Sequence, residues 1–272
     1  MADTFSGNTF GKRFSSMLRV DFKRLLLSRA FYIIVASCLL APILILVMTT
    51  MMDGTVSVDP QTGKETVIEG FDYVWQIIGS VSDSGASAEG GAMSMDLVSM
   101  CNINMLYFAI AALVCIFVSE DFMSGYAKNL FTVRAKKTDY VASKTLVLTF
   151  GAAMMILAFF IGSLVGGAVS GLSFEMVGFG VGNLIMCILS KTVLVSVFVP
   201  IYLVMSVIAK EKLWMSILLS LAVGMFLFMM IPMLTPLDAT ITNPFLCALG
   251  GVGFGFGLGA ISNLILKKTS LV

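Results

Sequence analysis

Six long apolar runs are the feature of this sequence that most restricts its fold. They cover residues 30–52, 97–118, 146–169, 177–209, 213–233 and 245–266. A helix rises about 1.5 Å per residue, so about 20 apolar residues cross the roughly 30 Å hydrocarbon core of a bilayer. The runs are apolar on every face, whereas the strands of a membrane barrel alternate apolar and polar residues. We therefore predict an all-α membrane protein with six transmembrane helices.

The composition excludes several classes of protein. Hydrophobic residues make up 58% of the 272 residues and charged residues only 12%, so neither a soluble fold nor a disordered chain is compatible with it. The absence of histidine removes Ser-His-Asp and Cys-His catalysis and His-ligated zinc. The five cysteines lie in or beside apolar stretches without a Cys-x-x-Cys pair, which is typical of small core residues.

The fourth run, 177–209, is longer than one perpendicular span requires. It contains Pro200, and a proline interrupts the hydrogen bonds of a helix. We expect strong tilt, a break near Pro200, or an outer half that does not cross the membrane.

Basic residues are concentrated in every second connection between the apolar runs, and this distribution predicts the orientation of the chain in the membrane. All of the 17 Lys and Arg except Lys64 and Lys191 lie in 1–29, 119–145, 210–212 or the C-terminal tail, whereas most acidic residues lie in the intervening connections. Short basic segments stay in the cytoplasm, so we predict that both termini are cytoplasmic. The predicted division is a cytoplasmic amphipathic helix at 1–29 and a six-helix transmembrane domain at 30–272, with an outer loop at 53–96.

Residues 10–28 place large apolar side chains at helical spacing, with basic side chains on the remaining faces. This pattern predicts a helix that lies on the inner leaflet, with its basic face toward anionic headgroups. The alternative is a basic flank whose periodicity is accidental. The residues expected at the membrane interface are Phe10, Phe14, Arg19, Phe22, Lys23 and Arg24.

The longest cytoplasmic connection, 119–145, mixes apolar Phe122, Tyr126, Leu130 and Phe131 with charged residues. A short helix that docks on a soluble partner has this composition, and a solvated loop that only fixes topology is the alternative. An acid at the end of the second run is followed by a Gly, then Lys-x-Leu, an Arg, and Tyr with Lys before the third run. These residues are Glu120, Gly125, Lys128, Leu130, Arg134, Tyr140 and Lys144.

With this segment, the six runs and the basic N-terminal helix, the whole chain resembles the permease subunits of the ABC-2 family of ATP-driven exporters. The resemblance implies that 119–145 contains the coupling helix, which seats in a groove of the ATPase. It also implies that the final outer connection, 232–244, re-enters the membrane as a short hairpin. The residues expected to couple to the ATPase are Glu120, Asp121, Gly125, Tyr126, Lys128, Asn129, Leu130 and Arg134.

The energy source is expected in another subunit. No Gly-x-x-x-x-Gly-Lys-Ser/Thr motif occurs in the chain, so it has no P-loop for ATP. We expect no catalytic residue, metal or cofactor here, and ATP with Mg²⁺ in a partner ABC ATPase, present in two copies. A six-helix permease is half a transporter, so we also expect a second copy of this chain or a related subunit, as a homodimer or a heterodimer, and no nucleic acid.

Polar residues within the spans are candidates for a translocation path. Lys191 is the only charge well inside a run, where a charge is costly and usually functional, although its side chain could also snorkel to the outer interface. Asn102 and Asn104 either line the path or bond across helices. Glycines that repeat every four residues, such as Gly162 with Gly166 and Gly251 with Gly255, predict close helix packing, within the chain or in a dimer.

The combined interpretation is a multi-pass permease of the bacterial plasma membrane that exports toxin-like or bacteriocin-like peptides or hydrophobic drugs. Abundant Met and Phe suit such cargo better than sugars or ions. The alternative is a stand-alone secondary transporter or channel that uses Lys191. An intramembrane enzyme is disfavoured because no acidic pair lies within a span.

Overall fold

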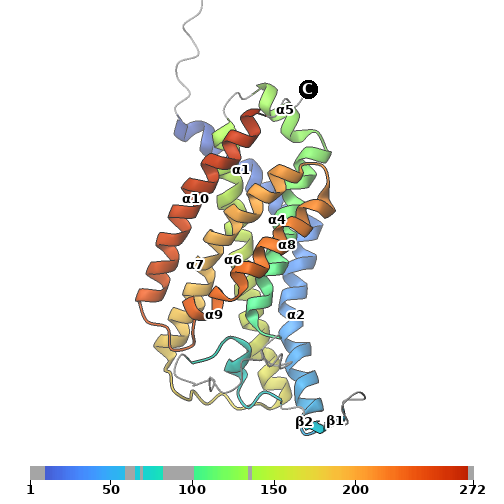
Figure 1. Cartoon of the computed structure of the whole chain (residues 1–272), viewed down its shortest axis with the longest axis vertical. Coiled ribbons are helices and arrows are strands. Elements are labelled where there is room, and N and C mark those ends of the chain that lie inside the picture. Colours follow the sequence, from blue (N-terminus) through green and yellow to red (C-terminus); the bar gives the residue numbers. More distant parts are fainter. Residues whose placement is uncertain (1–9, 59–64, 68–69, 82–100, 134–136, 269–272) are drawn as a thin grey trace, which may run out of the picture.

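The computed structural model describes residues 10–58, 65–67, 70–81, 101–133 and 137–268, and helices dominate it (Figure 1). The α-helices are α1 Phe10–Leu27, α2 Arg29–Met52, α4 Leu106–Met123, α5 Tyr126–Val133, α6 Lys137–Ser170, α7 Val181–Ala209, α8 Leu213–Phe228, α9 Met230–Leu234 and α10 Thr242–Lys268. The shorter elements are the 3₁₀ helices η1 Val74–Ile77 and η2 Ile103–Met105 and the antiparallel strands β1 Val56–Val58 and β2 Glu65–Val67. The prediction of an all-α protein is confirmed.

Among the described residues, five helices are long and apolar enough to cross a membrane: α2, α4 with η2, α6, α7 and α10. The fifth predicted span, 213–233, is divided between α8 and α9. With 16 residues, α8 is about 24 Å long at a rise of about 1.5 Å per residue, less than the hydrocarbon core requires. Six crossings therefore remain a prediction, while five helices meet the criteria of length and composition.

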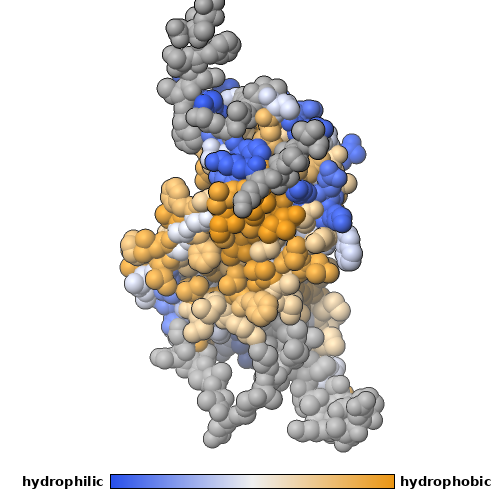
Figure 2. Space-filling model, turned by 45° about the horizontal axis from the view of Figure 1, so that its top comes forward, coloured by the Kyte–Doolittle hydropathy of each residue, from blue (hydrophilic) through white to orange (hydrophobic). Residues whose placement is uncertain are grey.

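The connections alternate between the two ends of the bundle. In Figure 1, α1, α5, the turn between α7 and α8, and the last turns of α10 lie at the top. The strands β1 and β2, the 171–180 connection and the segment 235–241 lie toward the bottom. We call these the α5 end and the hairpin end. Figure 2 shows a broad hydrophobic band beneath the hydrophilic residues of the α5 end.

The long fourth run forms the single helix α7, which begins only at Val181. It continues through Pro200 without interruption, so, of the three alternatives, the break near this proline is wrong. Pro200 is buried, and a membrane helix tolerates proline where neighbouring helices surround it. Part of the excess length of the run lies before the helix, because residues 177–180 are not helical.

The Gly162 and Gly166 repeat, and Gly251 of the second repeat, are sites of close helix packing. On α6, a Cβ at Gly162 would overlap the carbonyl oxygen of Leu39 in α2, and one at Gly166 would lie 2.9 Å from Ile43 Cα. On α10, a Cβ at Gly251 would overlap a side chain of α7, whereas Gly255 has nothing within 4 Å. Small residues thus bring α6 onto α2 and α10 onto α7.

Three connections cover the hairpin end of the bundle. The backbone N–H of Val74 in η1 donates to Ser173 O at 3.1 Å, and the indole N–H of Trp75 donates to Phe174 O at 3.1 Å. The N–H of Leu237 donates to Ser80 O at 2.9 Å. The segment 235–241 is irregular between the end of α9 and the start of α10, and re-entry of 232–244 into the membrane stays a prediction. Its residues pack against the segment that contains η1.

Candidate functional sites

Four charged side chains meet at the α5 end of the bundle, and we call them the ionic quartet. Asp21 and Arg24 come from α1, Asp121 from the last turn of α4, and Lys144 from the second turn of α6. The side chains of Asp21, Asp121 and Lys144 are fully buried, and that of Arg24 is 30% exposed. The quartet has two acids and two bases, so its formal charges balance.

Short ion pairs hold the quartet together. Lys144 Nζ lies 2.9 Å from Asp21 Oδ1 and 2.7 Å from Asp121 Oδ2, and Arg24 Nη1 lies 2.6 Å from Asp121 Oδ1. Two hydroxyls complete it: Tyr140 donates to Asp121 Oδ2 at 2.9 Å and Ser143 donates to Asp21 Oδ2 at 2.6 Å. Buried ions are tolerated when each is paired and hydrogen-bonded.

Aromatic rings cover the two cations of the quartet. Lys144 Nζ lies 4.2 Å from the ring centre of Phe117, and the Arg24 guanidinium lies 4.1 Å from that of Tyr126. Burial alone would lower the pKa of Arg24, but the charge of Asp121 and the hydrogen bond to it raise it. Burial, together with the negative charge of Asp21, raises the pKa of Tyr126. Arg24 therefore stays charged and Tyr126 neutral near neutral pH.

The helix α5 is joined to α4 by a tight turn at Gly125. The N–H of Ser124 donates to Glu120 O at 2.9 Å, and Gly125 has a φ of 71°, a left-handed conformation that favours glycine. One face of α5 packs on the bundle through buried Ala127 and through Phe131, whose ring centre lies 5.3 Å from that of Tyr140. The opposite face is exposed and contains Lys128, Asn129 and Thr132.

The structure divides the predicted coupling residues into three groups. Asp121 is in the quartet and Tyr126 lies against it. Glu120, Lys128 and Asn129 are exposed, whereas Leu130 within α5 and Gly125 at the turn before it are half-buried. Arg134 lies outside the described residues. A role of any of them in coupling stays a prediction.

The predicted membrane-interface residues of α1 also differ in their surroundings. Arg24 is paired within the protein, and the Phe22 ring meets that of Phe150 on α6 at 5.2 Å. Phe14 is half-buried, while Arg19 and Lys23 are exposed. Phe10 is the first residue of α1, and its side chain lies outside the described part. Helix α1 thus packs on α6 and leaves some of its basic residues for other contacts.

Sequence reasoning missed Asp21 and its pairing with Lys144. Asp21 lies four residues from Met17 and four from Leu25, both of which are buried, so helical spacing places it on the buried face of α1. An acidic residue on an otherwise buried helix face is the sequence signal that could have revealed a buried ion pair. A second ion pair joins the same helices, because Arg13 Nε lies 3.3 Å from Asp139 Oδ2 on α6.

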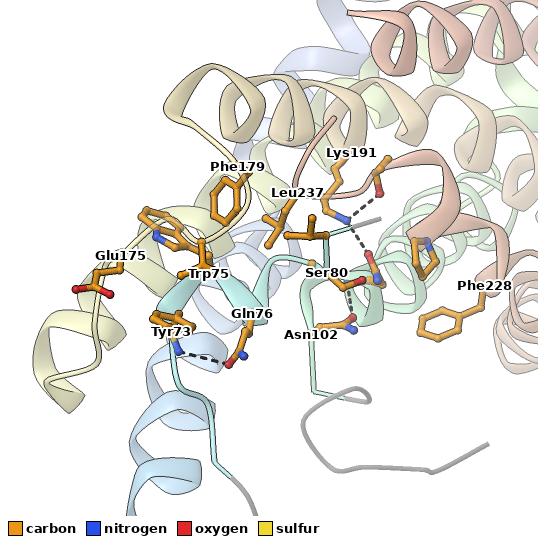
Figure 3. A pocket seen from close by; sticks show the side chains of 16 residues that line it. Tyr73, Trp75, Gln76, Ser80, Asn102, Glu175, Phe179, Lys191, Phe228 and Leu237 are labelled. Atoms are coloured by element: carbon orange, nitrogen blue, oxygen red, sulfur yellow. Dashed lines mark hydrogen bonds between the residues drawn. The ribbon is translucent and has the colours of Figure 1, made fainter. Parts of the chain in front are cut away.

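A cavity of about 500 Å³ lies toward the hairpin end of the bundle (Figure 3). Its lining includes Lys191 of α7, whose side chain is fully buried. Lys191 Nζ donates to Asn104 Oδ1 at 2.9 Å and to Thr235 Oγ1 at 2.8 Å. Rings of Trp75, Phe179 and Phe228 also line the cavity.

The three predicted path residues therefore lie around one cavity. Lys191 does not snorkel to the surface but is bonded between segments. Asn104 is its partner, and Asn102 supports Asn104 because its side-chain oxygen accepts the Asn104 N–H at 3.0 Å. A role in translocation stays a prediction for all three. No group of three or more Cys, Asp or Glu that could hold a metal occurs within the described ranges.

Comparison of the chain with curated proteins and with solved structures found no match. A family model described as ABC-2 family transporter protein matches residues 17–229. The match includes every residue of the ionic quartet as well as Lys191, and it ends before α10. It covers most of the chain. With its apolar membrane helices, the chain therefore belongs to the ABC-2 family of transporters, as a multi-pass, non-catalytic membrane permease subunit that works with ABC ATPase subunits.

Proposed function

We propose that this permease forms the translocation path of an ATP-driven exporter and that α5 receives the force from the ATPase. The observation that carries the proposal is the attachment of α5. Gly125 joins it directly to α4, and the Arg24 guanidinium of the quartet lies over Tyr126 in its first turn. A force applied to α5 is therefore transmitted to α1, α4 and α6 through direct contacts.

The exposed face of α5 is the proposed docking surface for the ATPase. Lys128, Asn129 and Thr132 share this face and are exposed, while the opposite face is fixed to the bundle. Coupling between distant sites needs an element that moves as a unit between discrete arrangements. A short helix clamped at its first turn suits that task, and the α5 end is then the cytoplasmic end.

The proposed assembly contains two ATPase subunits and two permeases, which are either two copies of this chain or this chain with a related one. The proposed cargo is a toxin-like or bacteriocin-like peptide or a hydrophobic drug, and the proposed location is the bacterial plasma membrane. The aromatic rings on the cavity support an apolar cargo. The family assignment removes the reason to prefer a stand-alone transporter.

Co-expression with an ABC ATPase tests the docking surface. We expect the permease and the ATPase to copurify with vanadate-sensitive ATP hydrolysis and cargo export. Lys128→Glu should reduce copurification and export together, because it reverses a charge in the centre of the proposed surface. Lys267→Glu reverses an exposed charge at the end of α10 and serves as the matched control. Normal copurification of Lys128→Glu would contradict the assignment of α5.

A further inference from the structure

The buried ammonium of Lys191 lacks a negative partner among the described residues. Both of its acceptors are neutral. Thr235 Oγ1 donates its proton to Ile231 O at 2.8 Å, so toward Lys191 this oxygen acts as an acceptor. An ammonium has three N–H donors, and the two bonds to Asn104 and Thr235 leave one for another group. A buried cation without a counter-ion is costly.

The surroundings of Lys191 are fixed before any ligand enters. Asn104 lies in η2, which Asn102 caps, and Thr235 ends α9. The hydroxyl of Tyr107 donates to the backbone oxygen of Lys191 at 2.9 Å and is itself buried. Two segments therefore hold the ammonium beside the cavity, and Tyr107 fixes the backbone that carries it. A preorganised charge of this kind loses little entropy when it binds an anion.

The cavity walls have the properties of a site for an amphipathic molecule. Trp75, Phe179 and Phe228 supply aromatic surface, and Gln76 and Tyr73 supply an amide and a hydroxyl (Figure 3). The cavity volume of about 500 Å³ lies within the range of sites that enclose small ligands. The cavity can therefore accept an anionic group together with several apolar side chains.

We propose that this cavity binds the C-terminal carboxylate of an apolar peptide, with the carboxylate on Lys191 Nζ. This inference rests on the proposed function, because it specifies which part of a peptide cargo the permease recognises. The carboxylate accepts the third N–H of the ammonium and supplies a negative charge that the described residues around Lys191 lack. The aromatic rings cover the last apolar side chains of the peptide.

Two features of the lining favour a peptide over a fatty acid or a polyanion. The Oε1 of Gln76 already accepts the N–H groups of Asp72 and Tyr73, but its NH₂ group and the Tyr73 hydroxyl can bond the polar groups of a peptide backbone, which an acyl chain lacks. Lys191 is the one basic residue among the described residues of the lining, which also includes the exposed acid Glu175, so a polyanion would find no second cation there. A ligand with one terminal carboxylate on an apolar peptide body satisfies both conditions.

Binding to the full-length permease in lipid nanodiscs tests the proposal without ATP. The probes are two four-residue apolar peptides with the same N-terminal fluorophore, one with a free C-terminal carboxylate and one with a C-terminal amide. We expect the carboxylate peptide to bind about tenfold tighter or more, since the amide lacks the charge that pairs with a buried cation. This comparison uses the unaltered protein, so it does not depend on the folding of a variant.

Variants then assign the preference to Lys191. Lys191→Met keeps a long apolar side chain and should reduce the carboxylate-to-amide ratio to about one by removing the ion pair. Lys212→Met, an exposed residue before α8 at the other end of the molecule, should keep the ratio. Equal binding of the two peptides to the unaltered protein, absence of binding, or an unchanged ratio in Lys191→Met would each overturn the proposal.

A fatty acid and the ATPase provide the remaining comparisons. Decanoate should compete with the carboxylate peptide only weakly. Effective competition at equal concentration would overturn the assignment to a peptide and indicate a fatty-acid ligand. Copurification with the ATPase, measured in parallel, reports on the proposed function alone. Failure of peptide binding with intact ATP-driven export would thus overturn this inference and leave the proposed function standing.

Discussion

Lys144 bridges Asp21 and Asp121, and its replacement tests the ionic quartet at the scale of single residues. Lys144→Met leaves Asp21 with a buried negative charge and, among the described residues, only the Ser143 hydroxyl as a donor. We expect the free energy of unfolding to fall by about 3–5 kcal/mol, as is usual when one partner of a buried pair is removed. Thermal unfolding of the purified protein in detergent measures the change.

The matched double variant separates charge balance from packing. Asp21→Asn combined with Lys144→Met restores equal numbers of acids and bases in the cluster. We expect it to recover at least part of the lost stability, because neighbouring sites in one ion network are not additive. Strictly additive losses would show that packing, and not the pairing of charges, is what Lys144 supplies.

Gly125 offers a second prediction at this scale. Its φ of 71° costs about 1–2 kcal/mol for most residues, but less for Asn. We expect Gly125→Ala to disturb the turn and reduce ATP-driven export relative to ATP hydrolysis, with Gly125→Asn less affected. Nothing lies within 4 Å of a Cβ at this position, so steric overlap is not the cause. Equal export by the two variants would contradict the argument from backbone conformation.

The sequence identified Lys191, Asn104 and Asp121 as important but could not identify their partners. A charge inside an apolar run is visible because hydropathy is a property of neighbouring residues in the chain. The contact between Lys191 and Thr235 joins residues on separate segments, and no local pattern encodes it. Asp21 was missed for the same reason, since its partner Lys144 lies on another helix.

At the scale of the elements, apolar runs located the helices but not their ends. Helix α6 begins at Lys137, before its predicted span at 146–169, and α4 continues to Met123, beyond the predicted end at 118. Both additions contain charged residues that are buried through ion pairs, such as Asp121 and Lys144. A hydropathy window counts such residues as polar, whereas a paired charge remains compatible with a packed helix.

The contact of α6 with α2 supplies the prediction at this scale. Gly162→Val would place a branched side chain against the backbone of Leu39 and the ring of Pro42. We expect a loss of about 1–3 kcal/mol or more in stability, because overpacking forces the helices apart. The control is Gly255→Val on α10, where a Cβ meets open space. Thermal unfolding of both variants measures the difference, and equal losses would contradict close packing at Gly162.

At the scale of the whole molecule, one helix connects the two candidate sites. Asn104 lies in η2 directly before α4, and Asp121 lies in the last turn of α4. Because α4 is one continuous helix that packs against α7, α8 and α6, we expect a displacement of its quartet end to move Asn104 as well. Force applied at α5 can therefore change the position of an acceptor of Lys191, which links the proposed docking surface to the proposed peptide site.

Labelling of single cysteines by a membrane-impermeant maleimide tests which end of the bundle faces outward and how many times the chain crosses the membrane. In a Cys101→Ser background the remaining native cysteines are buried. If α8 crosses the membrane, Glu175→Cys and Thr240→Cys should react in intact cells, and Glu211→Cys and Lys267→Cys only after permeabilisation. All four positions are exposed in the structure. Reaction of Thr240→Cys only after permeabilisation would contradict a sixth crossing by α8, which has only 16 residues, because the connection after α8 would then lie on the inner side of the membrane.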